Sequence, residues 1–255
     1  MPVGSHLAHD DELSALERLY LRIAGPPDPA LRRRTSHVLR ALGRMRPARV
    51  LDAACGAGFT TLSLARRLPT TAFYGIDIDR NQVARAQRLA EAAEIRNVEF
   101  SVADASSFDP PVAVDAVVCV DALEYFAHDD AFMRHARTVV RDGGSAVLHC
   151  RRVPTPRFLT SFRRADACYD GRLRAGYALA DIQRLFENAN FALVSIRETL
   201  NAPAEIAHEL LDPELGPLRH RALRAAVAPA LNALATLDAV ELGSGAGYLA
   251  VGRAS

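Results

Sequence analysis

Between Arg49 and Cys150 the chain alternates short apolar runs with longer segments in which apolar residues recur every three or four positions. The runs resemble strands and the longer segments resemble amphipathic helices. The strand-like runs cover residues 50–53, 72–78, 98–103, 113–120 and 145–150, and the helix-like segments cover 59–67, 80–93 and 130–141, the last ending at Gly143-Gly144. Because each parallel strand needs a crossover connection, this succession predicts an α/β fold with a doubly wound, mostly parallel sheet.

The two flanking parts of the chain have other patterns. Residues 10–24 and 29–45 carry helical apolar spacing and are separated by Gly25-Pro26-Pro27, which predicts an N-terminal helical cap of residues 1–46. The main domain is expected to span residues 47–255, with residues 151–179 and 201–240 as a lid and a helical insert. A helix at 180–188 and strands at 191–199 and 248–252 complete it.

Composition excludes several classes of protein. Thirty-one basic and 30 acidic residues give a formal net charge of +1, so no general attraction for nucleic acid or an anionic membrane is expected. Apolar runs shorter than a bilayer span and the lack of a signal-like start favour the cytoplasm. The four cysteines form no CxxC pair, and although Cys55, Cys119 and Cys150 fall near the ends of neighbouring strands, we expect buried thiols and no metal site.

The sequence VLDAACGAGF, residues 50–59, is a strand that runs into a glycine turn and opens a helix. This pattern indicates a nucleotide-like ligand at the carboxyl ends of the strands. Dinucleotide sites carry a third glycine where this chain has Thr61, and Asp52 would repel a pyrophosphate by roughly 1 to 4 kcal/mol at contact. A cationic ligand such as S-adenosylmethionine therefore suits the turn better than NAD.

Two more aspartates follow the next two strands. Asp77 lies about 20 residues past the glycine turn, where a carboxylate accepts hydrogen bonds from ribose hydroxyls. Asp104 follows the third strand and is placed to accept a hydrogen bond from an adenine amino group. Simpler roles stay open for all three: Asp52 as an ion-pair partner, Asp77 as a strand-end carboxylate and Asp104 as a turn former.

The segments VLDAACGAGF, FYGIDID, FSVADA, DAVVCVDALEYF and VVRDGGSAVLHC resemble the successive motifs of class I S-adenosylmethionine-dependent methyltransferases of the small-molecule group. The resemblance covers residues 49–150. It implies a Rossmann-like fold of seven strands in the order 3-2-1-4-5-7-6, with the seventh antiparallel. It also implies a cofactor site made by Asp52, Ala54, Gly56, Gly58, Asp77, Ile78, Asp104, Ala105, Cys119 and Val120.

Ala54 departs from the family pattern, because relatives most often have glycine there. The extra methyl group is tolerated if the residue keeps a negative φ.

Methyl transfer depends mainly on holding the reacting atoms in line, so a catalytic residue is not required. If a general base is used, the candidates are His149 at the end of the fifth strand, then His128, Tyr125 and Glu124 after the fourth. His149 alternates with Leu148 and Cys150 on a strand that we expect to be buried, so a hydrogen-bonded core histidine is the alternative.

The expected activity is methyl transfer to an oxygen, nitrogen or carbon atom of a small, partly apolar molecule, of the kind modified in natural-product tailoring. The aromatic residues of 151–179 would line its site, and the helical insert would enclose the substrate or form a homodimer. Two alternatives remain: an RNA or protein methyltransferase, which the neutral net charge disfavours in its RNA form, and a non-methylating protein, such as a cyclase-like enzyme or a binding module, that keeps the cofactor pocket.

Overall fold

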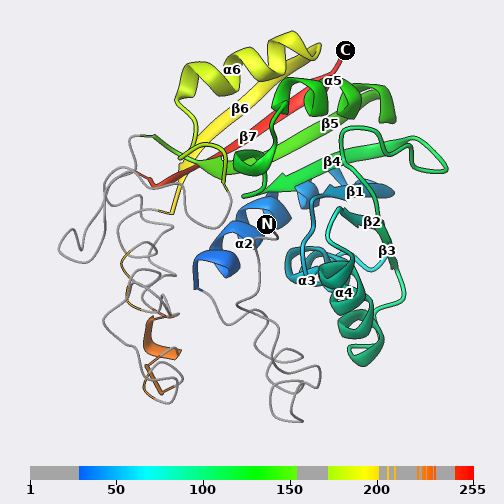
Figure 1. Ribbon diagram of the computed structural model, residues 1–255, viewed down its shortest axis with the longest axis vertical. Coiled ribbons are helices and arrows are strands. Elements are labelled where there is room, and N and C mark those ends of the chain that lie inside the picture. The colour runs from blue at the N-terminus through cyan, green and yellow to red at the C-terminus, as the bar shows by residue number, and fades with distance from the viewer. Residues whose placement is uncertain are drawn as a thin grey trace.

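A seven-stranded sheet with helices on both faces forms the centre of the molecule in a computed structural model (Figure 1). The structure describes residues 29–153, 172–200 and 245–255, together with isolated helical positions between 206 and 233. The strands are β1 (Arg49–Ala53), β2 (Ala72–Asp77), β3 (Val98–Val102), β4 (Val114–Val120), β5 (Val140–Arg151), β6 (Phe191–Thr199) and β7 (Gly247–Ala254).

The strand order confirms the expected topology. It is β3-β2-β1-β4-β5-β7-β6, in which β1 to β5 pair in parallel and β7 runs antiparallel to both of its neighbours. The helices are α2 (Pro29–Met45), α3 (Phe59–Arg67), α4 (Arg80–Ala92), α5 (Asp129–Val139) and α6 (Leu179–Asn188), with a short 3-10 helix η2 (Leu123–Tyr125). The carboxyl ends of β1 to β5 therefore share one edge of the sheet.

Two apolar cores lie on the two faces of the sheet. On one face α5 and α6 bury Phe132, Met133 and Phe186 against β4 and β5. On the other face α2 places Val38 and Leu42 against β1, β4 and β7, and α3 and α4 cover β2 and β3. The helix predicted at 29–45 thus packs directly on the sheet, in the same core as strands of the main domain.

The end of the last crossover helix differs from the prediction. Helix α5 ends at Val139, and Gly143 and Gly144 lie inside β5. Gly143 has a left-handed φ of 72°, and a side chain on Gly144 would approach the Asp115 carbonyl oxygen to 2.7 Å. The two glycines therefore allow β5 to pass close to the start of β4 at a shift in strand register.

Several predicted segments lie outside the described residues. They are the helix at 10–24, most of the lid and most of the insert. Among residues 29–153, 172–200 and 245–255, no helix combines the length and the apolar character needed to cross a bilayer.

Candidate functional site

The turn between β1 and α3 has a left-handed backbone at Ala54, Gly56 and Gly58, with φ values of 58°, 55° and 74°. Ala54 therefore does not keep the negative φ that was the condition for tolerating its methyl group without strain. The N–H of Cys55, the residue after Ala54, donates a hydrogen bond to the Ile76 carbonyl at 2.9 Å. The left-handed conformation of Ala54 turns the chain so that this bond forms. A left-handed conformation costs a non-glycine residue about 1 kcal/mol.

The two glycines of the turn serve different purposes. A side chain on Gly58 would meet the Phe100 ring at 2.8 Å and Ala86 Cβ at 2.9 Å, so this glycine is required for packing between helix and sheet. A Cβ on Gly56 would meet nothing within 4 Å. Gly56 therefore faces open space, as a turn that admits a ligand against its backbone should.

Ala54→Gly is expected to raise the free energy of unfolding by about 0.5 to 1 kcal/mol, because glycine adopts positive φ without strain while losing more chain entropy. Urea unfolding measures the change. The matched control is Ala53→Gly, one residue earlier in β1 and fully buried, which should destabilise the protein. A destabilised Ala54→Gly variant would contradict the strain described above.

Asp77, at the end of β2, connects the glycine turn to β2. Its Oδ2 accepts a hydrogen bond from the Gly56 backbone N–H at 2.8 Å, and its Oδ1 accepts one from the Asp79 N–H at 2.9 Å. A carboxylate has about four acceptor positions, so each oxygen keeps one for a ligand. Asp79 in turn caps α4, accepting from the N–H groups of Asn81 and Gln82.

Asp52 is buried at the centre of the site, at 2% exposure in β1. Its Oδ2 accepts a hydrogen bond from the Thr61 hydroxyl at 2.6 Å. Burial, offset in part by this hydrogen bond, raises the pKa of Asp52 to about 7. Thr61, at the position where dinucleotide sites have their third glycine, is thus the partner of this carboxyl group.

An exposed apolar surface adjoins Asp77. Ile78 is 75% exposed and Val102, which pairs with Asp77 across β2 and β3, is 43% exposed. Asp104 is exposed and accepts from the Ser106 N–H at 2.8 Å, which is the turn-forming role considered above, while Ala105 is buried. A flat apolar group with polar edges, such as a purine, fits next to these residues.

Cys119 and Val120 end β4. Cys119 is fully buried in the core on the α5 side, and Val120 is partly exposed. Burial raises the pKa of Cys119 and Cys150 well above the usual range of a thiol, so both are neutral. No group of three or more metal-ligating side chains occurs within the described part of the chain.

Four side chains form a row of polar contacts beyond the end of β4, here called the Asp121 cluster: Arg34 of α2, Asp121 of the loop after β4, His149 of β5 and Thr199 of β6. Arg34 Nε of α2 lies 2.7 Å from Asp121 Oδ2. Asp121 Oδ1 lies 2.5 Å from His149 Nδ1, and His149 Nε2 lies 2.8 Å from Thr199 Oγ1. The Asp121 carboxylate accepts from Nδ1 of His149, and the Thr199 hydroxyl occupies the other ring nitrogen.

Backbone geometry makes this cluster possible. Asp121 has a φ of 52°, and its N–H donates to the His149 carbonyl at 2.7 Å. Strand β7 lies between β5 and β6, and a side chain on its Gly247 would come within 3.0 Å of both His149 and Thr199. Glycine at this position therefore lets the two side chains meet across β7.

Charge also favours the cluster. Burial would raise the pKa of Asp121, but the Arg34 guanidinium and His149 outweigh it and hold that pKa well below its usual range. His149 is fully buried and both of its ring nitrogens are occupied. The structure therefore matches the alternative stated for His149, a hydrogen-bonded core histidine, and gives it no free nitrogen for a substrate proton.

The other candidate bases lie in η2 and at the start of α5. Glu124 is buried, accepts the Arg151 N–H on Oε1 at 2.5 Å, and has no hydrogen-bond partner for Oε2 among the described residues. Burial and the nearby Asp121 raise its pKa. Tyr125 is 42% exposed, and its hydroxyl accepts from Arg172 Nε at 3.2 Å. His128 is exposed at the N-terminus of α5.

Sequence reasoning missed the contacts that join Arg34, Asp121 and Thr199. A recognisable signal exists for Asp121, because a polar residue directly after a buried strand commonly takes a left-handed turn. Nothing local marks Thr199, whose partner is 50 residues away.

Comparison with known proteins finds methyltransferases. Residues 50–144 match the model of a methyltransferase domain. A trans-aconitate 2-methyltransferase of Methylobacterium nodulans is 32% identical over 40% of this chain and 38% of its own length. A ubiquinone biosynthesis O-methyltransferase of Xanthomonas axonopodis pv. citri is 26% identical over 56% of this chain and 60% of its own length. The chain thus aligns with less than two thirds of the length of each of these relatives.

A solved structure has the same fold. The O-methyltransferase of a trans-AT polyketide synthase multienzyme of Brevibacillus brevis, in complex with S-adenosyl-L-homocysteine, superposes with a TM-score of 0.58 at 15% identity, over 88% of this chain and 72% of that one. With the strand order and the glycine turn described above, these matches identify residues 50–144 as a methyltransferase domain, on the fold of the class I S-adenosylmethionine-dependent enzymes.

Proposed function

We propose that this protein transfers a methyl group from S-adenosylmethionine to an oxygen, nitrogen or carbon atom of a small, partly apolar molecule. The observation that carries the proposal is the position of Asp77. Its carboxylate fixes the Gly56 N–H at the edge of the sheet where Gly56 leaves open space, and each of its oxygens keeps an acceptor position. A ribose with two neighbouring hydroxyls matches that arrangement.

The residues present fit the whole cofactor. The open backbone at Gly56 and the buried Asp52 carboxyl suit its cationic methionine end, and Ile78, Val102 and Asp104 suit its adenine. When bound, S-adenosylmethionine supplies a methyl group activated by a sulfonium sulfur.

The contribution of the protein is the orientation of the reactants. Holding two reacting groups in line supplies up to about 7 to 11 kcal/mol without a catalytic side chain. The Asp121 cluster connects α2 to the ends of β4, β5 and β6, next to the expected position of the methyl group. We assign its residues, His149 included, a positioning role. Tyr125 and His128 are the partly or fully exposed side chains that remain candidates for a base.

The names of the relatives support a small acceptor. One relative is named for methylation of trans-aconitate, a small molecule, and the other for an O-methylation in ubiquinone biosynthesis. We extend only the class of acceptor to this chain, and natural-product tailoring is one setting in which such an acceptor occurs.

Incubation with methyl-labelled S-adenosylmethionine and small-molecule extracts of the source organism tests the proposal. We expect label in a small product, and less of it with the Asp77→Ala variant when the cofactor is below saturation. If tight cofactor binding occurs without transfer to small molecules, RNA or protein, the chain is a non-methylating member of the family. Transfer to macromolecules alone would replace the acceptor class proposed here.

Affinity for S-adenosyl-L-homocysteine is expected to rise between about pH 6 and pH 7.5. The carboxyl group of Asp52 ionises in this range, because its pKa is about 7, and the charged form attracts the ammonium group of the ligand. Calorimetry at several pH values measures the effect. Asp52→Asn should bind with little pH dependence, and an equal rise in that variant would exclude Asp52 as the cause.

A further inference from the structure

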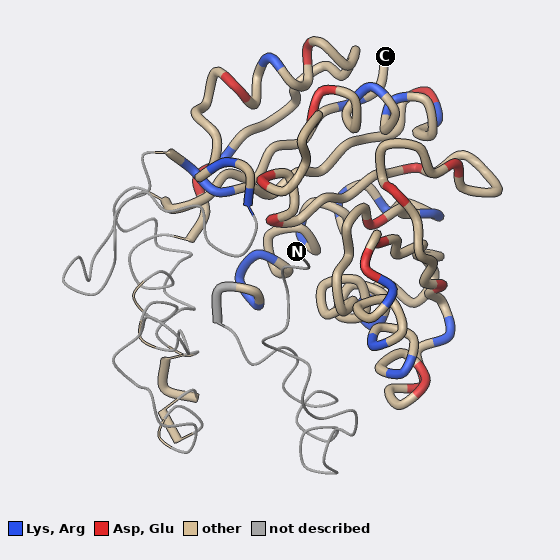
Figure 2. Tube along the Cα trace, in the orientation of Figure 1, with Lys and Arg blue, Asp and Glu red and all other residues tan. Residues whose placement is uncertain are grey.

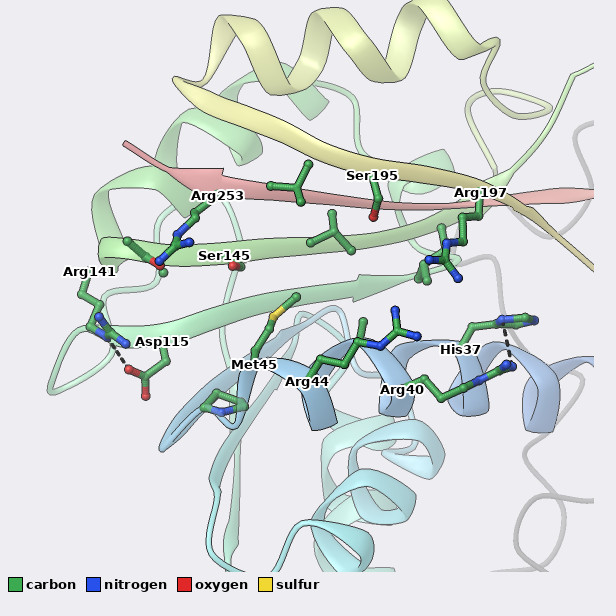
Figure 3. Close-up of a pocket in the computed structure, with 17 residues that line it drawn as sticks. His37, Arg40, Arg44, Met45, Asp115, Arg141, Ser145, Ser195, Arg197 and Arg253 are labelled. Atoms are coloured by element: carbon green, nitrogen blue, oxygen red, sulfur yellow. Dashed lines mark hydrogen bonds and ion pairs between the residues drawn. The ribbon is translucent and has the colours of Figure 1, made fainter.

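A second concave surface lies away from the glycine turn, here called the arginine groove. It has a volume of about 540 Å³ and is bounded by α2 on one side and by β5, β6 and β7 on the other (Figure 3). The charged residues that line it are Arg40, Arg44, Asp115, Arg141, Arg197 and Arg253. None of these residues belongs to the cofactor site or to the Asp121 cluster.

The groove concentrates positive charge that the rest of the chain does not have. Among the described residues that line it are five arginines and one carboxylate, Asp115, whereas the whole chain has a net charge of only +1. Asp115 already forms an ion pair with Arg141 and accepts the Arg49 N–H at 2.7 Å. Figure 2 shows the basic positions of α2 beside the sheet.

Two of the arginines lack a counter-charge. Arg44 rises from α2 and Arg197 extends from β6 on opposite sides of the same space (Figure 3). Both side chains are exposed, and neither forms a hydrogen bond or an ion pair with any described residue. At one end Arg40 lies 3.2 Å from His37 Nδ1, and at the other Arg253 donates to the Gly143 carbonyl at 3.2 Å.

The floor of the groove is apolar. Met45 and Ala41 of α2 face Leu249 and Val251 of β7 there. Guanidinium groups bind phosphate oxygens in a two-pronged manner, and each phosphate monoester carries close to two negative charges at neutral pH. Two phosphate groups are enough to balance Arg44, Arg197 and Arg253, none of which forms an ion pair with a described residue.

We propose that the arginine groove binds a small organic molecule that carries two or more phosphate groups, with its organic part on the apolar floor. A volume of about 540 Å³ lies within the range of small-molecule sites, about 300 to 1,000 Å³, which favours a small ligand over an acidic protein surface. The proposal is independent of the methyl-transfer activity.

Calorimetry on the full chain at low ionic strength, with pyrophosphate and ATP as probes, tests this site. We expect both to bind, ATP more tightly because its nucleoside covers the floor, and saturating S-adenosyl-L-homocysteine to leave both affinities unchanged. Arg44→Gln/Arg197→Gln should weaken binding by at least about tenfold. Arg67→Gln/Arg96→Gln, the same charge change at exposed positions outside the groove, should not.

Each variant is also tested for binding of S-adenosyl-L-homocysteine. Unchanged binding shows that the variant is folded and that a loss of phosphate affinity does not come from damage to the cofactor site. Absence of binding by either phosphate probe would overturn the proposal, and so would unchanged affinity in Arg44→Gln/Arg197→Gln. Displacement of pyrophosphate by S-adenosyl-L-homocysteine would place the anion at the glycine turn instead. Tighter binding of polyglutamate than of ATP would identify the groove as a protein-docking surface.

Discussion

Asp121→Ala is expected to lower the free energy of unfolding by about 3 kcal/mol and to reduce methyl transfer by more than about tenfold. The change leaves the Arg34 guanidinium and the His149 ring without their shared partner while both stay largely buried, and breaking such a pair costs about 3 to 5 kcal/mol. It also places alanine at a φ of 52°. Urea unfolding gives the stability, and transfer of labelled methyl gives the activity.

Asp121→Asn separates charge from shape. Asparagine tolerates the left-handed backbone and keeps an acceptor for His149, so it should lose less stability than alanine while still lacking the charge that Arg34 pairs with. If the alanine variant is as stable as the wild type, the row of contacts from Arg34 to Thr199 does not hold α2 on the sheet. A stable alanine variant with full activity would also remove the positioning role.

Asp77→Ala is expected to weaken binding of S-adenosyl-L-homocysteine by at least tenfold, about 1.4 kcal/mol. Two effects act together: the ligand loses the acceptor for its ribose, and the Gly56 and Asp79 N–H groups lose the carboxylate that holds the turn against β2. Calorimetry measures the affinity.

Asp79→Ala is the matched control, because it removes a carboxylate two residues away on the same loop. It deletes the cap of α4 and should cost about 1 kcal/mol of stability while leaving cofactor affinity within a few-fold of the wild type. Equal losses of affinity in the two variants would mean that loop stability, and not contact with the ribose, explains the effect of Asp77.

Most of the sheet could be predicted because its signals are local. The strand at 191–199 and the helix at 59–67 have the predicted bounds, since apolar periodicity and glycine punctuation act over a few residues. The order of the strands came from resemblance, not from periodicity. Gly143-Gly144 was misplaced because a glycine pair is equally suited to a helix end and to an irregular strand, and the close approach to Asp115 that decides between them is a tertiary contact.

Only those site residues that belong to short sequence motifs were predicted. Asp52 and Gly56 belong to the motif at the end of β1 and Asp77 to the motif at the end of β2, and the structure brings Gly56 and Asp77 into contact. The Asp121 cluster brings together Arg34 and Thr199, which are far apart in the sequence. Its formation depends on Gly247, whose missing side chain matters only once β7 lies between β5 and β6.

A crystal structure of the protein with S-adenosyl-L-homocysteine tests the central claim most directly. We expect the ligand across the ends of β1, β2 and β3, with its ribose hydroxyls on Asp77, its adenine beside Ile78 and its amino-acid end at Gly56. A ligand bound elsewhere, or none at concentrations that saturate other methyltransferases, would contradict this assignment of the site.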